Sequence, residues 1–330
     1  MIYLDATAID CFLTCREAYR RRYLFKISEE QERPGIIPVE PSIYLSFGHA
    51  VHTAVELWHK GNEYEECLHH AAIDMEEAGK KLEGRLRPDM EIKWRELGLA
   101  LPECVAVYCD GVEPAPESEI EQEWMVPFTD DLGGRSPTNV TLCGKIDRYH
   151  KHVLYDVKTA SEVGKTWKAD YRSTLLRTFQ FGLYDWYLST RERSERSAIQ
   201  STGDVAPIAC KIEVIVKPYR GKPARLEVFD LPEIRVYRKR FKQQLAWVVS
   251  EIEQYHYGFA DTFPWPMAGS QTCQGKFSAC DYLKICCMGD TPRVLEGYRE
   301  REEHLEILRI QHQVGGGYLA TQAKPAALKN

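Results

Sequence analysis

The segment GKIDRYHKHVLYDVKTA, at residues 144–160, constrains the fold more than any other part of the sequence. Residues 140–150 and 152–160 are rich in the β-branched and aromatic residues that favour strands. They meet at a turn near Lys151, so the sequence predicts a β-hairpin. The helical segments on either side of this hairpin would have to fold back onto it.

The predicted hairpin carries three charged side chains on one surface. Asp147 and Asp156 lie roughly level on the paired strands. Asp156 and Lys158 are two residues apart and share a face, whereas Val157 points to the other face and can enter the core. Two carboxylates on a hydrophobic hairpin are costly to bury unless they bind something, and Mg²⁺ prefers such oxygens. A lone Asp-x-Lys is more often an ordinary exposed pair, so the rest of the chain must decide.

The hydrophobic pattern along the chain predicts an α/β fold with a central sheet flanked by helices. Thr7 is the expected N-cap of the first helix, with Asp10 as its capping-box partner, and Ser173 is the expected cap of a later helix. Helices are predicted at residues 7–26, 46–60, 62–109 (with breaks near Gly84 and Pro88), 173–189, 232–257 and 295–312, and strands at 119–128, 140–150, 152–160, 210–219 and 224–230.

Composition narrows the class of protein. The 330 residues are 44% hydrophobic, which is enough for a sizeable core. No apolar run approaches the roughly 20 residues of a membrane helix, and the N-terminus lacks the basic region of a signal peptide. We therefore expect a cytoplasmic, intracellular protein with no membrane association. The net charge of −6 does not indicate nucleic-acid binding, although the basic residues between Arg16 and Lys26 form either a solvated helix face or a phosphate-binding cluster.

Four short motifs occur in a recognisable order. They are Gly48-x-x-x-His52, Gly144-Lys145-Ile146-Asp147, Asp156-Val157-Lys158 and Gln180-x-x-x-Tyr184. Each has an ordinary structural explanation, such as a core histidine or an i, i+4 pair on one helix face. Together they resemble the RecB-like branch of the PD-(D/E)XK nucleases.

This resemblance implies a restriction-endonuclease-like mixed sheet flanked by helices, and a Mg²⁺ or Mn²⁺ ion as cofactor. It implies metal contacts from His52, Asp147, Asp156 and the backbone carbonyl of Val157. Lys158 would be the catalytic lysine. Gln180 and Tyr184 would close the site on the DNA side, so all five of the catalytic candidates would lie on the hairpin or on the helix that follows it. These candidates are Asp147, Asp156, Lys158, Gln180 and Tyr184.

The cysteines suggest a second centre. Of eleven cysteines, Cys273, Cys280 and Cys286 are too widely spaced for a usual zinc ribbon. Cys15 opens an arginine- and tyrosine-rich segment that resembles the iron–sulfur nucleases of the same family, such as AddB-type enzymes, although Glu17 and a missing proline depart from their pattern. The resemblance implies a 4Fe–4S cluster held by Cys15, Cys273, Cys280 and Cys286, with Cys11 or Cys287 as alternatives. The remaining cysteines are expected in the core, namely Cys67, Cys104, Cys109, Cys143 and Cys210.

These inferences combine into one expectation. Residues 1–315 form a single nuclease domain, with a helical part at 1–110, a sheet core at 119–260, a cysteine-rich segment at 261–290, and a disordered tail at 316–330. The resemblance implies a DNA exonuclease for recombination or repair, suited to a phage or mobile element, with DNA and a helicase or recombination protein as partners. Two alternatives stay open: a non-catalytic DNA-binding or assembly protein with this fold, and a structural zinc protein.

Overall fold

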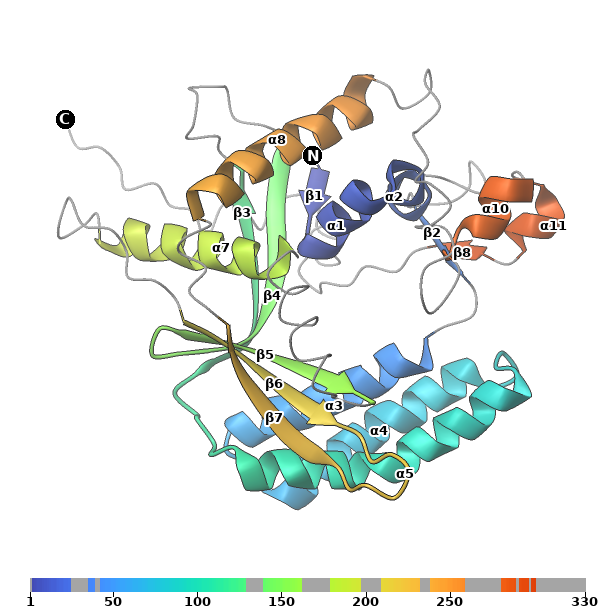
Figure 1. Cartoon of the computed structure of the whole chain (residues 1–330), viewed down its shortest axis with the longest axis vertical. Helices are drawn as coiled ribbons and strands as arrows, with labels where there is room; N and C mark the ends of the chain where they lie inside the picture. Colours follow the sequence, from blue (N-terminus) through green and yellow to red (C-terminus); the bar gives the residue numbers. More distant parts are fainter. Residues whose placement is uncertain are drawn as a thin grey trace.

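A mixed β-sheet with helices on both sides forms the centre of the molecule (Figure 1). The structure, a computed structural model, describes residues 2–24, 35–38, 42–128, 139–161, 179–196, 209–231, 238–258, 280–288, 291–296 and 298–300. The strands of the main sheet are β1 (Ile2–Leu4), β3 (Glu119–Pro127), β4 (Val140–His150), β5 (Val153–Ala160), β6 (Ala209–Val216) and β7 (Arg225–Leu231). A separate two-stranded sheet joins β2 (Ile36–Pro38) to β8 (Tyr298–Glu300).

The helices are α1 (Ala6–Thr14), α2 (Arg16–Tyr23), α3 (Ile43–His59), α4 (Tyr64–Leu82), α5 (Pro88–Gly111), α7 (Phe179–Arg196), α8 (Arg238–Gly258), α10 (Leu283–Met288) and α11 (Pro292–Leu295). Helices α1, α7 and α8 lie on one side of the sheet, and α3, α4 and α5 lie on the other (Figure 1). Among the described helices, none combines the length and the apolar composition of a membrane span. The predicted α/β class with helix-flanked mixed sheet is confirmed.

Strand β4 organises the sheet. Strand β3 pairs with it antiparallel along residues 141–149, which occupies one of its edges. Its other edge is shared by β1, parallel at residues 140–142, and by β5, antiparallel at residues 148–150. The sheet continues from β5 through a parallel pairing to β6 and an antiparallel pairing to β7. Strands β1 and β5 therefore leave β4 at opposite ends, and the backbone between them faces the candidate site.

The hairpin between β4 and β5 forms as the sequence predicts. Lys151 and His152 have φ values of 46° and 64°, as a two-residue type I′ turn requires. The paired residues are Arg148 with Tyr155, Tyr149 with Leu154 and His150 with Val153. Continuing the same register by one residue places Asp147 opposite Asp156, as expected from the turn position.

Two apolar cores lie on the two faces of the sheet. The first packs α1, α7 and α8 against residues such as Leu142, Leu154 and Val214. The second packs α3, α4 and α5 against Val157 of β5 and Ile215 of β6, whose side chains lie on the opposite face of the sheet. Alternate residues of β5 and β6 thus enter different cores, because successive side chains of a strand face opposite sides.

A buried polar network fixes helices α3 and α5 against the sheet. Glu213 of β6 accepts hydrogen bonds from Tyr108 Oη, at 2.7 Å, and from Arg148 Nη2, at 2.5 Å. The Tyr108 hydroxyl also lies 2.9 Å from Nε2 of His59, and burial lowers the pKa of that histidine to about 3. A neutral His59 is therefore part of the contact that holds the helix of His52 in place.

The first helix departs from the prediction. In place of one helix over residues 7–26, α1 and α2 are separated by Cys15, whose backbone is extended with φ −159° and ψ 112°. Its Sγ accepts the N–H of Ala18 at 3.5 Å and so caps α2. The N-cap of α1 is Asp5, not Thr7, because the Asp5 carboxylate accepts the N–H of Ala8 at 2.6 Å.

Asp10 has a different partner from the one predicted. Its carboxylate accepts the N–H of Phe179 at 3.4 Å and so helps to satisfy the beginning of α7. Burial raises the pKa of Asp10 to about 6. The expected capping box inside the first helix is therefore replaced by a contact between two helices far apart in sequence.

The other predicted helix and strand boundaries agree in part with the structure. The region predicted as helical at 62–109 forms α4 and α5, with its break between Leu82 and Pro88. The prediction did not include β1 and β2, and residues 298–300 pair with β2 as a strand instead of continuing a helix over 295–312. The predicted cap at Ser173 and the predicted disordered tail at 316–330 lie outside the described residues.

Candidate metal centre

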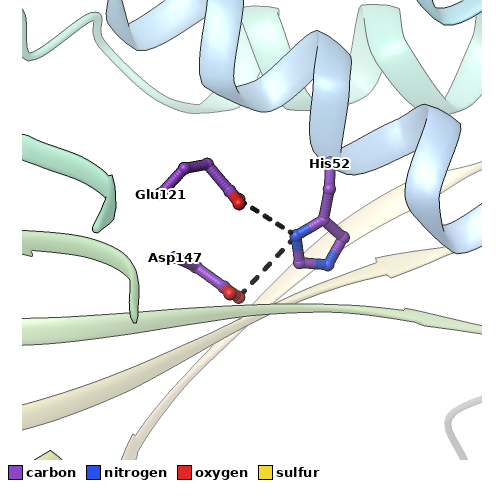
Figure 2. Close-up of side chains that lie close together, drawn as sticks. All are labelled: His52, Glu121 and Asp147. Atoms are coloured by element: carbon purple, nitrogen blue, oxygen red, sulfur yellow. Dashed lines mark ion pairs between the residues drawn. The ribbon is translucent and has the colours of Figure 1, made fainter. Parts of the chain in front are cut away.

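The imidazole of His52 projects from α3 toward two carboxylates on neighbouring strands. Figure 2 shows its Nδ1 atom between Glu121 and Asp147, at 3.6 Å from Glu121 Oε1 and 3.8 Å from Asp147 Oδ2. One ligand atom from each of the three residues lies within 4.8 Å of the others. The residue one turn earlier, Gly48, faces β5, where a Cβ would make an ordinary contact, 3.7 Å from Thr159 Oγ1.

The other nitrogen of His52 faces the backbone of β5. His52 Nε2 lies 3.1 Å from the carbonyl oxygen of Val157. Burial alone would lower the pKa of His52, but Asp147 and Glu121 together raise it. Without a cation, the two acids therefore favour the protonated form of the ring.

Asp147 is anchored at the point where β4 and β5 separate. Its Oδ2 accepts the backbone N–H of Val157 at 2.8 Å. This bond replaces the strand pairing at the position where Asp147 and Asp156 would meet. The same oxygen of Asp147 lies 3.8 Å from Nδ1 of His52.

Asp156 is fully buried, with 1% of its surface exposed. Its Oδ1 accepts from Lys158 Nζ at 2.8 Å and from Gln180 Nε2 at 2.9 Å. Its Oδ2 has no hydrogen-bond partner among the described residues. Burial raises the pKa of Asp156 to about 6 despite the opposing effect of Lys158. A buried carboxylate oxygen that has no hydrogen-bond donor is a suitable ligand for a cation.

Glu121 is the site residue that the sequence analysis missed. It lies opposite Asp147 in the β3–β4 register, and its φ of 50° is unusual for a residue with a side chain. Lys145 forms an ion pair with it, and the pairs with Lys145 and His52 lower the pKa of Glu121 even though burial alone would raise it. The alternation of Glu119, Glu121 and Glu123 was a signal, but only strand register shows which glutamate meets Asp147.

Gln180 and Tyr184 lie one turn apart on α7 and contact each other at 3.1 Å. The Tyr184 hydroxyl donates to the backbone carbonyl of Lys145 at 2.6 Å, so it braces the uncovered edge of β4. Burial raises the pKa of Tyr184 well above its ordinary value. Both side chains are directed at Asp156 and β4, and neither lines the cleft in front of the metal centre.

A cleft of about 680 Å³ opens over the metal centre. Glu121, Lys145, Asp147, Val157 and Lys158 form its inner wall. The rest of its lining comes from α3 with its N-cap and from the strand ends, namely Ser42, Tyr44, Leu45, Gly48, His49, His52, Thr53, Glu56, Thr159, Ser161 and Lys217. The donors gathered at the metal centre are the carboxylates of Glu121 and Asp147, the His52 imidazole and the Val157 carbonyl, which suit a hard divalent cation such as Mg²⁺ or Mn²⁺.

Cysteines from the two ends of the described chain gather at a second location. Cys11, Cys15, Cys280 and Cys286 pack against one small apolar cluster that includes Ala18, Tyr282 and Ile285. Cys273 lies outside the described residues, and Cys287 is exposed. The structure buries the other predicted core cysteines, Cys67, Cys104, Cys143 and Cys210, and partly buries Cys109.

The basic cluster near the N-terminus is engaged within the protein. Arg16 pairs with Glu251 of α8, and Arg20 and Arg21 both pair with Glu17. Arg21 is itself buried. The burial of Arg21 rules out a fully solvated face for that residue. A phosphate-binding role for the cluster stays a prediction.

Fold and site together define a class of protein, one that binds a metal where two strands of a mixed sheet separate beneath a helix. The sequence model of the PD-(D/E)XK nuclease superfamily matches residues 4–287, which is most of the chain. The chain therefore belongs to the PD-(D/E)XK nuclease superfamily, and this membership indicates a metal-dependent nuclease. A search for related curated proteins gave no match.

Proposed function

We propose that the protein is a deoxyribonuclease whose catalytic cation is held by His52, Asp147, Asp156 and the carbonyl oxygen of Val157. One observation carries the proposal: His52 and Asp147 offer ligand atoms within 4.8 Å of each other where β4 and β5 separate, and the next acid, Asp156, has a buried oxygen without a donor. Glu121 adds a third acidic side chain to this group. A cation would satisfy the ligand atoms of His52, Glu121 and Asp147 together.

The protein's own residues would prepare the reaction in distinct ways. A bound Mg²⁺ or Mn²⁺ supplies a Lewis acid that polarises a phosphoryl oxygen and acidifies water. Lys158, whose side chain is 31% exposed and reaches the cleft, orients the attacking water and stabilises charge on the phosphate. Gln180 holds Asp156 in position, and Tyr184 holds the strand that carries Asp147. These two are positioning residues.

The proposed substrate is DNA, cut from an end, in recombination or repair. Support comes from membership in the nuclease superfamily and from a cleft that leaves room for a strand in front of the metal centre. A phage or mobile element is the proposed setting, and a helicase or recombination protein is the proposed partner.

A 4Fe–4S cluster held by Cys15, Cys273, Cys280 and Cys286 is the second part of the proposal. Three of these thiols, together with Cys11, already gather around one apolar cluster. Such a centre would tie α2 to the C-terminal segment, and its assembly would contribute to folding stability. Cluster-binding thiolates also suit a reducing, intracellular compartment.

The test is a cleavage assay on labelled linear DNA with Mg²⁺, with Mn²⁺ and with a chelator. Wild-type protein should cut only with a cation, and Lys158→Ala should lose at least about 10²-fold in rate while still binding Mn²⁺. Asp147→Asn should lose both cleavage and Mn²⁺ affinity, measured by calorimetry. A folded wild-type protein that binds DNA but never cuts it would favour a non-catalytic assembly protein. Colourless protein that contains zinc would favour a structural zinc protein.

A further inference from the structure

Lys217 occupies an unusual position at the carboxyl end of β6. Only 9% of its surface is exposed, yet it lines the cleft of the metal centre. Its backbone N–H donates to the carbonyl of Ala160 at 2.8 Å, which continues the β5–β6 pairing past the catalytic motif. Ligands of open α/β sheets bind outside the carboxyl ends of the strands, and Lys217 stands at that edge.

The charge of Lys217 is not balanced by an acid in the described part of the chain. The described acids that share the cleft have other partners: Glu56 pairs with Lys60, Glu121 with Lys145, and Asp147 with His52. The Lys217 ammonium instead lies 5.0 Å from the ring centroid of Tyr44 and 5.3 Å from that of Phe47. Attraction to two rings offsets only part of the cost of burying an ammonium, and burial lowers the pKa of Lys217. A bound anion would complete the site.

Tyr44 is the complementary half of this site. It lies in the first turn of α3, lines the same cleft and leaves 45% of its surface exposed. The beginning of a 17-residue helix also carries partial positive charge, which favours an anion nearby. An exposed aromatic ring beside a cation and a helix N-terminus is the combination that binds a base together with its phosphate.

We propose that Lys217 and Tyr44 form a subsite for an unpaired nucleotide adjacent to the scissile phosphate, with the phosphate on Lys217 and the base stacked on Tyr44. The inference rests on the proposed nuclease function and assigns it a substrate class, single-stranded nucleic acid. An internal base of a duplex is already stacked on both faces, so it cannot also stack on Tyr44. The subsite should therefore favour a single strand, or a frayed end, over a closed duplex.

The experiment measures binding of a fluorescein-labelled 12-nucleotide single strand and of a blunt hairpin duplex by anisotropy, in Ca²⁺, over a range of salt concentrations. Lys217→Met should weaken single-strand binding by about 10-fold and reduce the slope of log K against log salt by roughly 0.7, one phosphate contact. Tyr44→Leu should weaken single-strand binding by about 10-fold with an unchanged slope, and Tyr44→Phe should restore it. Duplex binding should change by less than about 2-fold in each variant.

Matched controls lie elsewhere on the protein. Lys211→Met removes a lysine from the other end of β6, where it faces Asp230, and Tyr257→Leu removes an exposed tyrosine from α8. Neither should change single-strand affinity. Lys217→Arg retains the charge and should retain the salt slope, which keeps the test valid if Lys217→Met does not fold.

Three results would overturn the inference. They are wild-type protein that does not bind the single strand, an unchanged affinity and salt slope in Lys217→Met, and an equal loss of single-strand and duplex binding in Tyr44→Leu. Failure of the proposed function gives a different result. In that case the single strand binds as predicted and depends on Lys217, but the wild-type protein does not cut it with Mg²⁺ or Mn²⁺.

Discussion

Replacing Asp156 with asparagine should stabilise the metal-free protein at neutral pH. The carboxylate is buried, and burial raises its pKa from an ordinary value of 3.8 to about 6. Its Oδ1 accepts from Lys158 and Gln180, while its Oδ2 has no donor among the described residues. An asparagine can place its carbonyl at the Oδ1 position and so keep both of these hydrogen bonds, while it removes the charge of the buried carboxylate.

The sign and size of this change in stability follow from the pKa of Asp156. A group whose pKa is higher in the folded protein binds more protons in that state, so stability is lost as pH rises from about 4 to about 6. Above this window the ionised carboxylate costs the metal-free protein about 3 kcal/mol. The difference in unfolding free energy between Asp156→Asn and wild type should be near zero at pH 4 and approach about 3 kcal/mol at pH 8.

Urea unfolding in a chelator, monitored by circular dichroism from pH 4 to pH 8, measures this difference. Asp230→Asn removes an exposed carboxylate from β7 and serves as the control, with no comparable rise. Adding Mg²⁺ should stabilise wild type, by about 2.7 kcal/mol at a hundred times its dissociation constant, and leave Asp156→Asn nearly unchanged. If the difference in unfolding free energy between Asp156→Asn and wild type stays constant from pH 4 to pH 8, the reasoning is refuted.

Three further predictions concern the strand, the acid group and the cysteines. Gly144→Ala should destabilise the protein by about 1–3 kcal/mol in urea unfolding, because its Cβ would lie 2.7 Å from the Trp124 ring; an unchanged midpoint would contradict this packing. Glu121→Gln should lower Mn²⁺ affinity by at least about 10-fold in calorimetry, and an affinity equal to wild type would exclude it from the metal centre. Cys280→Ser should give colourless protein with reduced iron content, whereas Cys143→Ser, in the apolar core, should leave iron unchanged; equal iron in both would argue against the cluster.

Local sequence patterns determined much of the fold. The alternation on either side of Lys151 predicted the hairpin, and its turn length fixed the register that places Asp147 opposite Asp156. Helical periodicity likewise predicted α4 and α5, with a break between them. These features depend on residues close together in the chain, whose geometry is set by backbone sterics and by the period of the side chains.

The tertiary structure alone decided which distant residues meet. Glu121 is one of three alternating glutamates, and only the pairing of β3 with β4 places it beside His52. Asp10 resembled the partner in a capping box, but the packing of α1 against α7 gives it the N–H of Phe179. Lys217 lies at the end of an apolar strand and has no motif around it. Its role comes from its burial beside Tyr44, which lies on a segment far away in the sequence. Such a contact leaves no local sequence pattern, because it depends on how separate elements pack.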